Sequence, residues 1–104
     1  MAKPVIRRIA IGKGSIGSKD VMAAYMKVQL DLPDYFGGNL DALYDLLSEV
    51  REETIFETDA SMLEELTPDS YALKTLEVLS RAAQENPRIH LYLTDRRMNE
   101  DEWV

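Results

Sequence analysis

The sequence has no cysteine and a single histidine, His90, in 104 residues. Without thiols it can form no disulfide framework and no thiolate metal site, and one histidine cannot build a histidine cluster around a metal. We expect His90 to be a partly exposed structural residue. No apolar run approaches the roughly 18 residues that a membrane-spanning helix needs. We therefore expect a cytoplasmic protein with no metal, no cofactor and no membrane partner.

Basic residues are also in the minority, because 12 Lys and Arg stand against 19 Asp and Glu, which gives a net charge of -7. This charge repels phosphate backbones and attracts basic partners from a distance, so we expect no direct binding of nucleic acid. The hydrophobic fraction of 45% and the charged fraction of 30% are typical of one globular domain. We assign residues 1–95 to that domain and expect residues 96–104, which include Trp103, to form a charged, flexible tail.

Hydrophobic periodicity predicts strands that alternate with helices along the domain. Short runs rich in β-branched residues indicate strands, and apolar residues at three- and four-residue spacing indicate helices. Strands separated by helical segments of this length pair in parallel. The sequence therefore predicts an α/β fold, a small three-stranded parallel sheet packed by three to four helices. The predicted strands are residues 5–11, 54–58 and 89–94, and the predicted helices are residues 19–30, 40–50, 60–66 and 68–86.

Helix starts and buried faces can be predicted in the same way. Ser18 and Asn39 are expected to cap the first two long helices, and Thr67 with Pro68 is expected to open the last one. The expected buried stripes are Val21, Ala24, Tyr25 and Val28 in the first helix, Leu40, Leu43, Leu46, Leu47 and Val50 in the second, and Ile89, Leu91 and Leu93 in the last strand.

Residues 12–17 spell G-x-G-x-x-G between a predicted strand and a predicted helix. This is the context of a dinucleotide-binding turn, in which glycines let a pyrophosphate approach backbone N–H groups. A dinucleotide site, however, requires a sheet with two mononucleotide-binding halves, and about three strands are too few. We favour a flexible glycine turn that binds no ligand.

The predicted helix at residues 40–50 has a second, polar side. Asp41, Tyr44, Asp45 and Ser48 fall together there, facing away from the leucine stripe. Repulsion between two aspartates four residues apart costs roughly 0.2 to 0.5 kcal/mol, and the low helix propensity of aspartate adds up to about 0.7 kcal/mol. Folding alone does not require this pair. The pattern leaves two interpretations open, an ordinary solvated surface and a binding surface.

Residues 30–47 read LDLPDYFGGNLDALYDLL, and this segment resembles the central signature of the barstar family of ribonuclease inhibitors. The similarity includes an aromatic pair, a glycine and two spaced aspartates in register. It implies a barstar-like fold, with which the predicted order of strands and helices agrees. It also implies a chain that is not an enzyme, is a monomer when free, and inhibits a small basic ribonuclease stoichiometrically.

The resemblance also implies roles for individual residues. Asp45 would take the place of the scissile phosphate, and Asp41 would pair with a second cation of the ribonuclease. Tyr35 and Tyr44 would exclude water from these pairs, and Asn39 would hold the helix rigid. The implied partner contacts are Tyr35, Phe36, Gly37, Gly38, Asn39, Leu40, Asp41, Tyr44, Asp45, Val78 and Arg81.

Some positions depart from the family pattern. Gly38 replaces an acid that is frequent in the family loop, and Val50 stands where the best-known member has a tryptophan. Val78 aligns with a contact position on the exposed side of the last helix, but Arg81 falls where that member has an acid. These differences predict a cognate ribonuclease with a different rim and weak inhibition of distant ribonucleases.

Two other functions stay open. The chain could be an acidic binding module for another basic protein, because one fold can carry different functions. It could also bind a nucleotide, or act as an enzyme, through the glycine turn at residues 12–17.

Overall fold

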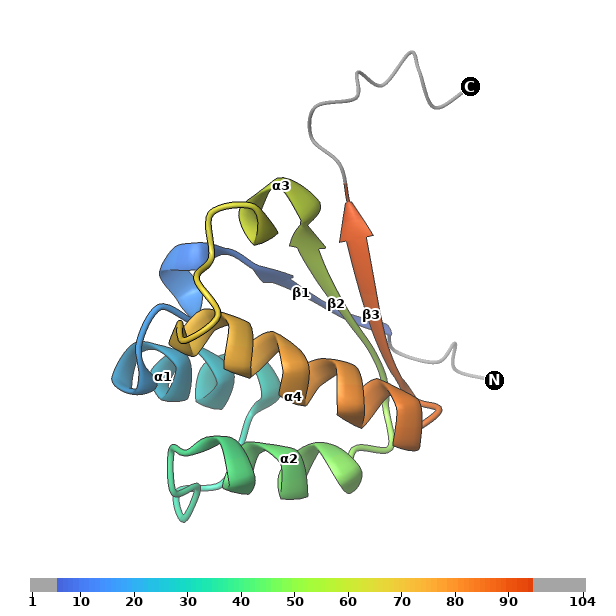
Figure 1. Cartoon of the computed structure of the whole chain (residues 1–104). Coiled ribbons are helices and arrows are strands. Elements are labelled where there is room, and N and C mark those ends of the chain that lie inside the picture. The colour runs from blue at the N-terminus through green and yellow to red at the C-terminus, as the bar shows by residue number, and fades with distance from the viewer. Residues whose placement is uncertain (1–5, 95–104) are drawn as a thin grey trace, which may run out of the picture.

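A computed structural model describes residues 6–94 of the protein (Figure 1). Three strands pair in parallel in the order β1-β2-β3, and four helices connect them, which confirms the predicted α/β fold. The predicted tail at residues 96–104, with Trp103, lies outside the described residues. The elements are β1 (Ile6–Ile11), a 3-10 turn (Lys13–Ser15), α1 (Lys19–Leu30), α2 (Leu40–Ser48), β2 (Glu53–Asp59), α3 (Ala60–Leu63), α4 (Tyr71–Glu85) and β3 (Ile89–Thr94).

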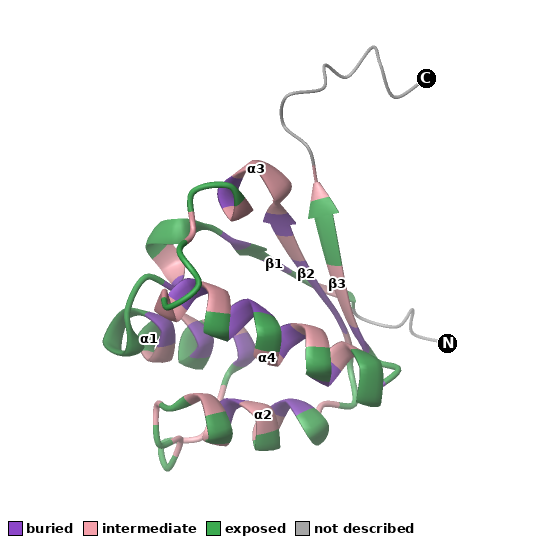
Figure 2. Cartoon of the chain, in the orientation of Figure 1, coloured by how far each residue is buried: buried purple, intermediate pink, exposed green. Residues whose placement is uncertain are grey.

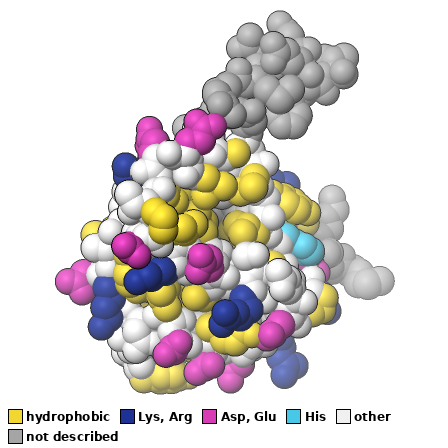
Figure 3. Space-filling view, viewed as in Figure 1, with side chains coloured by type: hydrophobic (Ala, Val, Ile, Leu, Met, Phe, Trp, Pro, Cys, Tyr) yellow, Lys and Arg dark blue, Asp and Glu magenta, His cyan; other side chains and the backbone are white. Residues whose placement is uncertain are grey.

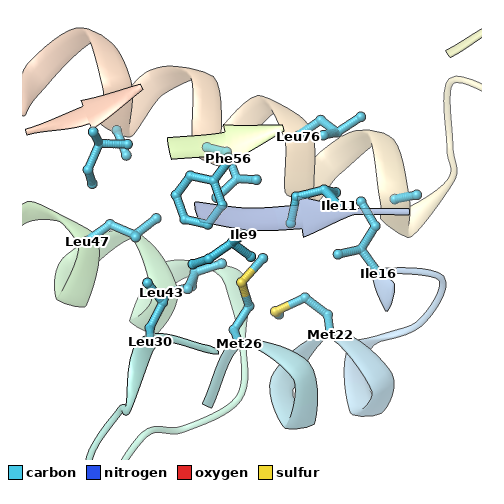
Figure 4. Packing of buried hydrophobic residues seen from close by; sticks show 14 of the residues in the cluster. Ile9, Ile11, Ile16, Met22, Met26, Leu30, Leu43, Leu47, Phe56 and Leu76 are labelled. Carbon is cyan, nitrogen blue, oxygen red and sulfur yellow. The ribbon is translucent and has the colours of Figure 1, made fainter. Parts of the chain in front are cut away.

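The core lies between the sheet and the helices α1, α2 and α4, which cover the same face of the sheet (Figures 1 and 2). The strand register aligns Ile9, Phe56 and Leu91 on this face. Phe56 is fully buried in the central strand, and side chains from the other elements pack around it (Figure 4). The buried cluster comprises Ile9, Ile11, Ile16, Met22, Met26, Leu30, Leu43, Leu47, Phe56, Met62, Ala72, Leu76, Leu79, Ala82 and Ile89.

The other face of the sheet carries charged side chains that pair with one another. Arg8 Nη1 lies 3.1 Å from Glu57 Oε1, and Arg88 Nη1 lies 3.3 Å from Glu53 Oε1. His90 Nε2 lies 2.7 Å from the other carboxylate oxygen of Glu53. We call this surface the open sheet face, because none of the helices at residues 6–94 covers it (Figure 1). Parallel sheets are usually covered on both faces, and here paired charges let the second face meet water.

The buried side of α1 differs from the prediction. Met22, Met26 and Leu30 are buried, whereas Val21 and Val28 of the predicted stripe are exposed, Val28 by 76%. The helix has two apolar stripes, and the sequence pattern alone does not rank them. Met22 and Met26 lie against Ile9 and Ile11 of β1 in the core (Figure 4). Tyr25 of the predicted stripe is half-buried, and its hydroxyl donates to Ala10 O in β1.

The start of α4 was also predicted wrongly. The helix begins at Tyr71, and Leu73 N–H donates to the Ser70 hydroxyl at 3.2 Å, so Ser70 is the cap. Thr67 and Pro68 precede the helix in a turn, in which Ser70 N–H donates to Thr67 O at 3.0 Å. Because hydroxyl residues stabilise turns as well as helix ends, the earlier signal marked the turn.

The last strand is buried only at its beginning. Ile89 is 2% exposed, Leu91 is half-buried, and Leu93 is 57% exposed although the prediction placed it on the buried face. Leu93 points to the correct side of the sheet, but it borders an open hollow beside α4 instead of the core. Hydrophobic side chains gather at this place in the space-filling view (Figure 3). No helix at residues 6–94 is both long and apolar enough to cross a membrane.

Candidate partner-binding face

The segment at residues 31–39 connects α1 to α2, and its own hydrogen bonds fix its shape. Leu32 N–H donates to Lys27 O at 3.0 Å, which closes the end of α1. Phe36 N–H donates to Pro33 O, also at 3.0 Å, and forms a tight turn. The aromatic residues before α2 are therefore held by backbone contacts.

Gly38 determines how the segment enters α2. Its φ is +76°, a conformation that residues with a side chain rarely adopt. A Cβ at this position would lie 3.2 Å from the Cβ of Ala23 in α1, closer than an ordinary contact. Gly37 has no positive φ, and a Cβ there would lie 3.6 Å from its nearest neighbour. Gly38 thus allows the entry to α2 to pack directly against α1.

The helix α2 presents Asp41 and Asp45 on one exposed side. Ala42 N–H donates to Asn39 Oδ1 at 2.7 Å, so Asn39 caps the helix as predicted. Asp41 lies in the first turn, where the positive end of the helix favours a carboxylate. Asp45 follows four residues later and projects from the same side. Within residues 6–94, neither carboxylate forms an ion pair or a hydrogen bond.

A hollow of about 250 Å³ opens beside Asp45. Tyr35, Phe36 and Asp45, which the sequence predicts as site residues, lie together around it. Glu49 also lines the hollow and was not predicted. The signal was available, because Asp41, Asp45 and Glu49 follow one another at four-residue spacing. We call this surface of α2, with its three carboxylates and the hollow, the acidic face.

Two side chains of α4 contact α2 next to the acidic face. The Arg81 guanidinium carbon lies 5.9 Å from the ring centroid of Tyr44, over the ring. The Tyr44 hydroxyl donates a hydrogen bond to Glu85. This bond raises the pKa of Tyr44 above its ordinary value of 10.0. Sequence reasoning missed Glu85, because its role depends on the contact between two helices that are distant in sequence.

Leu40 and Val78 are half-buried and pack against the core cluster. The sequence placed Val78 on the exposed side of the last helix, and in the structure the residue is half-buried. Its side chain is partly covered because α4 packs along α2. Val78 thus offers a partner only part of its surface.

The glycine motif at residues 12–17 forms a turn, as favoured above. It contains the 3-10 turn and leads into α1, which Ser18 caps. A hollow of about 570 Å³ lies beside the turn, but Glu57, Asp59 and Glu65 are among the residues that line it. Lys13 also lines the hollow, but its Nζ lies 3.9 Å from Glu65 Oε2. The three carboxylates outnumber this one cation and repel a phosphate, so the geometry does not support a dinucleotide site.

The fold and the acidic face define a small α/β protein that displays exposed carboxylates from a capped helix beside an aromatic-walled hollow. The sequence profile of a family described as Barstar (barnase inhibitor) matches residues 7–96, nearly the whole chain. The chain belongs to this family. A comparison with curated proteins found no match.

Proposed function

We propose that the protein inhibits a small basic ribonuclease of the barnase type by binding it stoichiometrically and covering its active site with the acidic face. The observation that carries this proposal is the pair Asp41 and Asp45, which is exposed on one side of α2 and unpaired within residues 6–94. A ribonuclease must hold cations where it stabilises a phosphoryl transition state. Two carboxylates set in place can occupy such a site.

In this proposal Asp45 replaces the scissile phosphate. It lies at the edge of the hollow, so cationic side chains of the enzyme can bond to it while their apolar parts contact Tyr35 and Phe36. Tyr35 is 79% exposed in the free chain and can cover these bonds from water. Asp41 pairs with a second cation of the enzyme.

The backbone that carries the acidic face is formed before the partner arrives. Asn39 caps α2, and Gly38 packs its entry against α1. Because the backbone of α2 need not be ordered on binding, less conformational entropy is lost. This preformed backbone supports tight binding.

The proposal assigns no catalytic role to the chain. The single histidine, His90, is bonded to Glu53 on the open sheet face. It is therefore not placed to act as a base or an acid together with Asp41 and Asp45.

The test is a titration of active ribonucleases with the purified chain. Barnase is assayed first, followed by the small basic ribonucleases secreted by the source organism, with RNA cleavage as the readout. We expect loss of activity at a one-to-one molar ratio. The association rate should fall steeply with added salt. The charge of -7 attracts a cationic enzyme from a distance, and in roughly 0.1 M salt this attraction extends only about 10 Å.

Unchanged cleavage by all these enzymes at a large molar excess of the chain would contradict the proposal. If the chain then bound a basic protein that is not a nuclease, the alternative of an acidic binding module would be supported.

A further inference from the structure

We propose that Arg81 makes this protein selective for ribonucleases that carry an acidic side chain at the rim of the active-site cleft. The inference rests on the proposed function and describes the part of the partner that meets α4. It starts from a basic residue that lies beside an otherwise acidic binding surface.

Arg81 lies at the border of the acidic face. Its guanidinium is held over the ring of Tyr44, and Tyr44 precedes Asp45 in α2. Arg81 is exposed, so its N–H donors are open to a partner that covers α2. The cation is therefore positioned next to the carboxylates, on the neighbouring helix.

Within residues 6–94 Arg81 has no carboxylate partner. In the described part of the sequence it forms no ion pair, although Glu85 follows it at the four-residue spacing that favours such pairs in helices. Glu85 instead accepts the hydrogen bond from Tyr44. The positive charge of Arg81 is thus left for water or for a partner.

A partner that covers Tyr44 also removes water from Arg81. Taking a charge out of water is costly unless an opposite charge and hydrogen bonds replace the water. A carboxylate on the partner, matched to the planar guanidinium by two parallel hydrogen bonds, satisfies this condition. A lysine or arginine at the same place would be repelled, and this repulsion excludes ribonucleases with a fully basic rim.

The partner should therefore present two charges of opposite sign. Its cationic centre faces Asp41 and Asp45, and its acidic rim residue faces Arg81. The protein then selects a partner that has both the cationic centre, through Asp41 and Asp45, and the acidic rim residue, through Arg81.

The experiment uses the active ribonuclease that the titration above identifies, with barnase as the first probe. Arg81→Met keeps an apolar side chain over Tyr44 and removes the charge, and Arg81→Glu reverses the charge. Arg8→Met and Arg8→Glu make the same charge changes on the open sheet face, away from the partner. Dissociation constants and both rate constants are measured for each complex.

We expect Arg81→Met to weaken binding about 30-fold and Arg81→Glu about 100-fold or more, mainly through faster dissociation. The Arg8 variants should change mainly the association rate. Single lysine substitutions of the acidic rim residues of the ribonuclease complete the test. One of them should weaken the wild-type complex and restore binding to Arg81→Glu.

Three results would overturn the inference. The first is binding of the Arg81 variants as tight as that of wild type. Equal losses for Arg81→Met and Arg81→Glu, with no rescue by a rim lysine, would show that Arg81 only supports Tyr44. Unchanged binding of Asp45→Ala would refute the proposed function, and the inference with it. If Asp45→Ala abolishes inhibition and the Arg81 variants do not weaken it, the inference alone fails.

Discussion

The open sheet face and the acidic face carry their charges in different ways. On the open sheet face, arginine, histidine and glutamate side chains pair with one another at 2.7 to 3.3 Å. On the acidic face, Asp41 and Asp45 have no such partner within residues 6–94. Charges that are satisfied inside the chain have little left to offer a partner. The two surfaces thus differ in the pairing of their charges, and this difference is the reason why we propose the acidic face as the binding surface.

The largest expected difference between the two faces is in affinity. Asp45→Ala should weaken ribonuclease binding by about 2 kcal/mol or more, roughly 30-fold, because cations of the enzyme lose their bonding partner in a desolvated contact. Glu57→Ala removes the same charge from the open sheet face and should alter the affinity little. Isothermal titration calorimetry on both variants measures this difference. Similar losses for the two variants would mean that only total charge matters.

The second difference is in backbone geometry. The acidic face depends on a positive φ at Gly38, where the chain enters α2. Gly38→Ala should lower the free energy of unfolding by about 1 to 2 kcal/mol, because alanine is strained at positive φ. Crowding against Ala23 adds to this effect. Gly37→Ala is the matched control, and its effect should stay within about 0.5 kcal/mol. Urea denaturation of both variants provides the measurement, and equal effects would argue against the special role of Gly38.

The same Asp45→Ala variant should be more stable than wild type. It removes repulsion from Asp41 and improves helix propensity, which together raise the free energy of unfolding by about 0.5 to 1 kcal/mol. Glu57→Ala should lower stability slightly, because Arg8 loses its partner. Thermal and urea denaturation distinguish the gain of stability in Asp45→Ala from the loss in Glu57→Ala. A less stable Asp45→Ala would show that the acidic face contributes to folding.

The smallest expected effect is a pH dependence on the open sheet face. The hydrogen bond from His90, with Arg88 nearby, lowers the pKa of Glu53 below its ordinary value of 4.5. Such a shift stabilises the fold above pH 4.5, and the stabilisation disappears as the pH falls through the lowered pKa. Glu53→Gln should therefore be less stable than wild type at neutral pH, and the difference should shrink in acid. Urea denaturation from about pH 7 to about pH 3 follows this change. If the difference in free energy of unfolding between the two proteins grew in acid, the pKa of Glu53 would be raised and not lowered.

Local signals predicted most of the fold correctly. Ser18 and Asn39 cap their helices as expected, and the three strands pair in parallel. These features depend on neighbours within a few residues or on simple alternation along the chain. Errors arose where two local signals competed, as at Thr67 and Ser70, or where two apolar stripes competed on α1.

The part of the candidate site that lies in one continuous segment could be predicted from the sequence. The loop and helix at residues 35–45 lie together because they are consecutive. Glu49 continues the same spacing and could have been found. Glu85 and the position of Arg81 over Tyr44 could not, because they depend on how α4 lies against α2. Whether these residues bind a ribonuclease stays a prediction.

The sequence by itself determined the type and order of the elements, apart from details such as the start of α4. It also determined the spacing that sets Asp41 and Asp45 on one side of a helix, because this follows from the fixed geometry of helices. Tertiary structure decided which stripe of α1 is buried, which charges find partners, and where Arg81 lies. These outcomes depend on packing and on distances between segments that are far apart in the chain. Local periodicity does not contain that information.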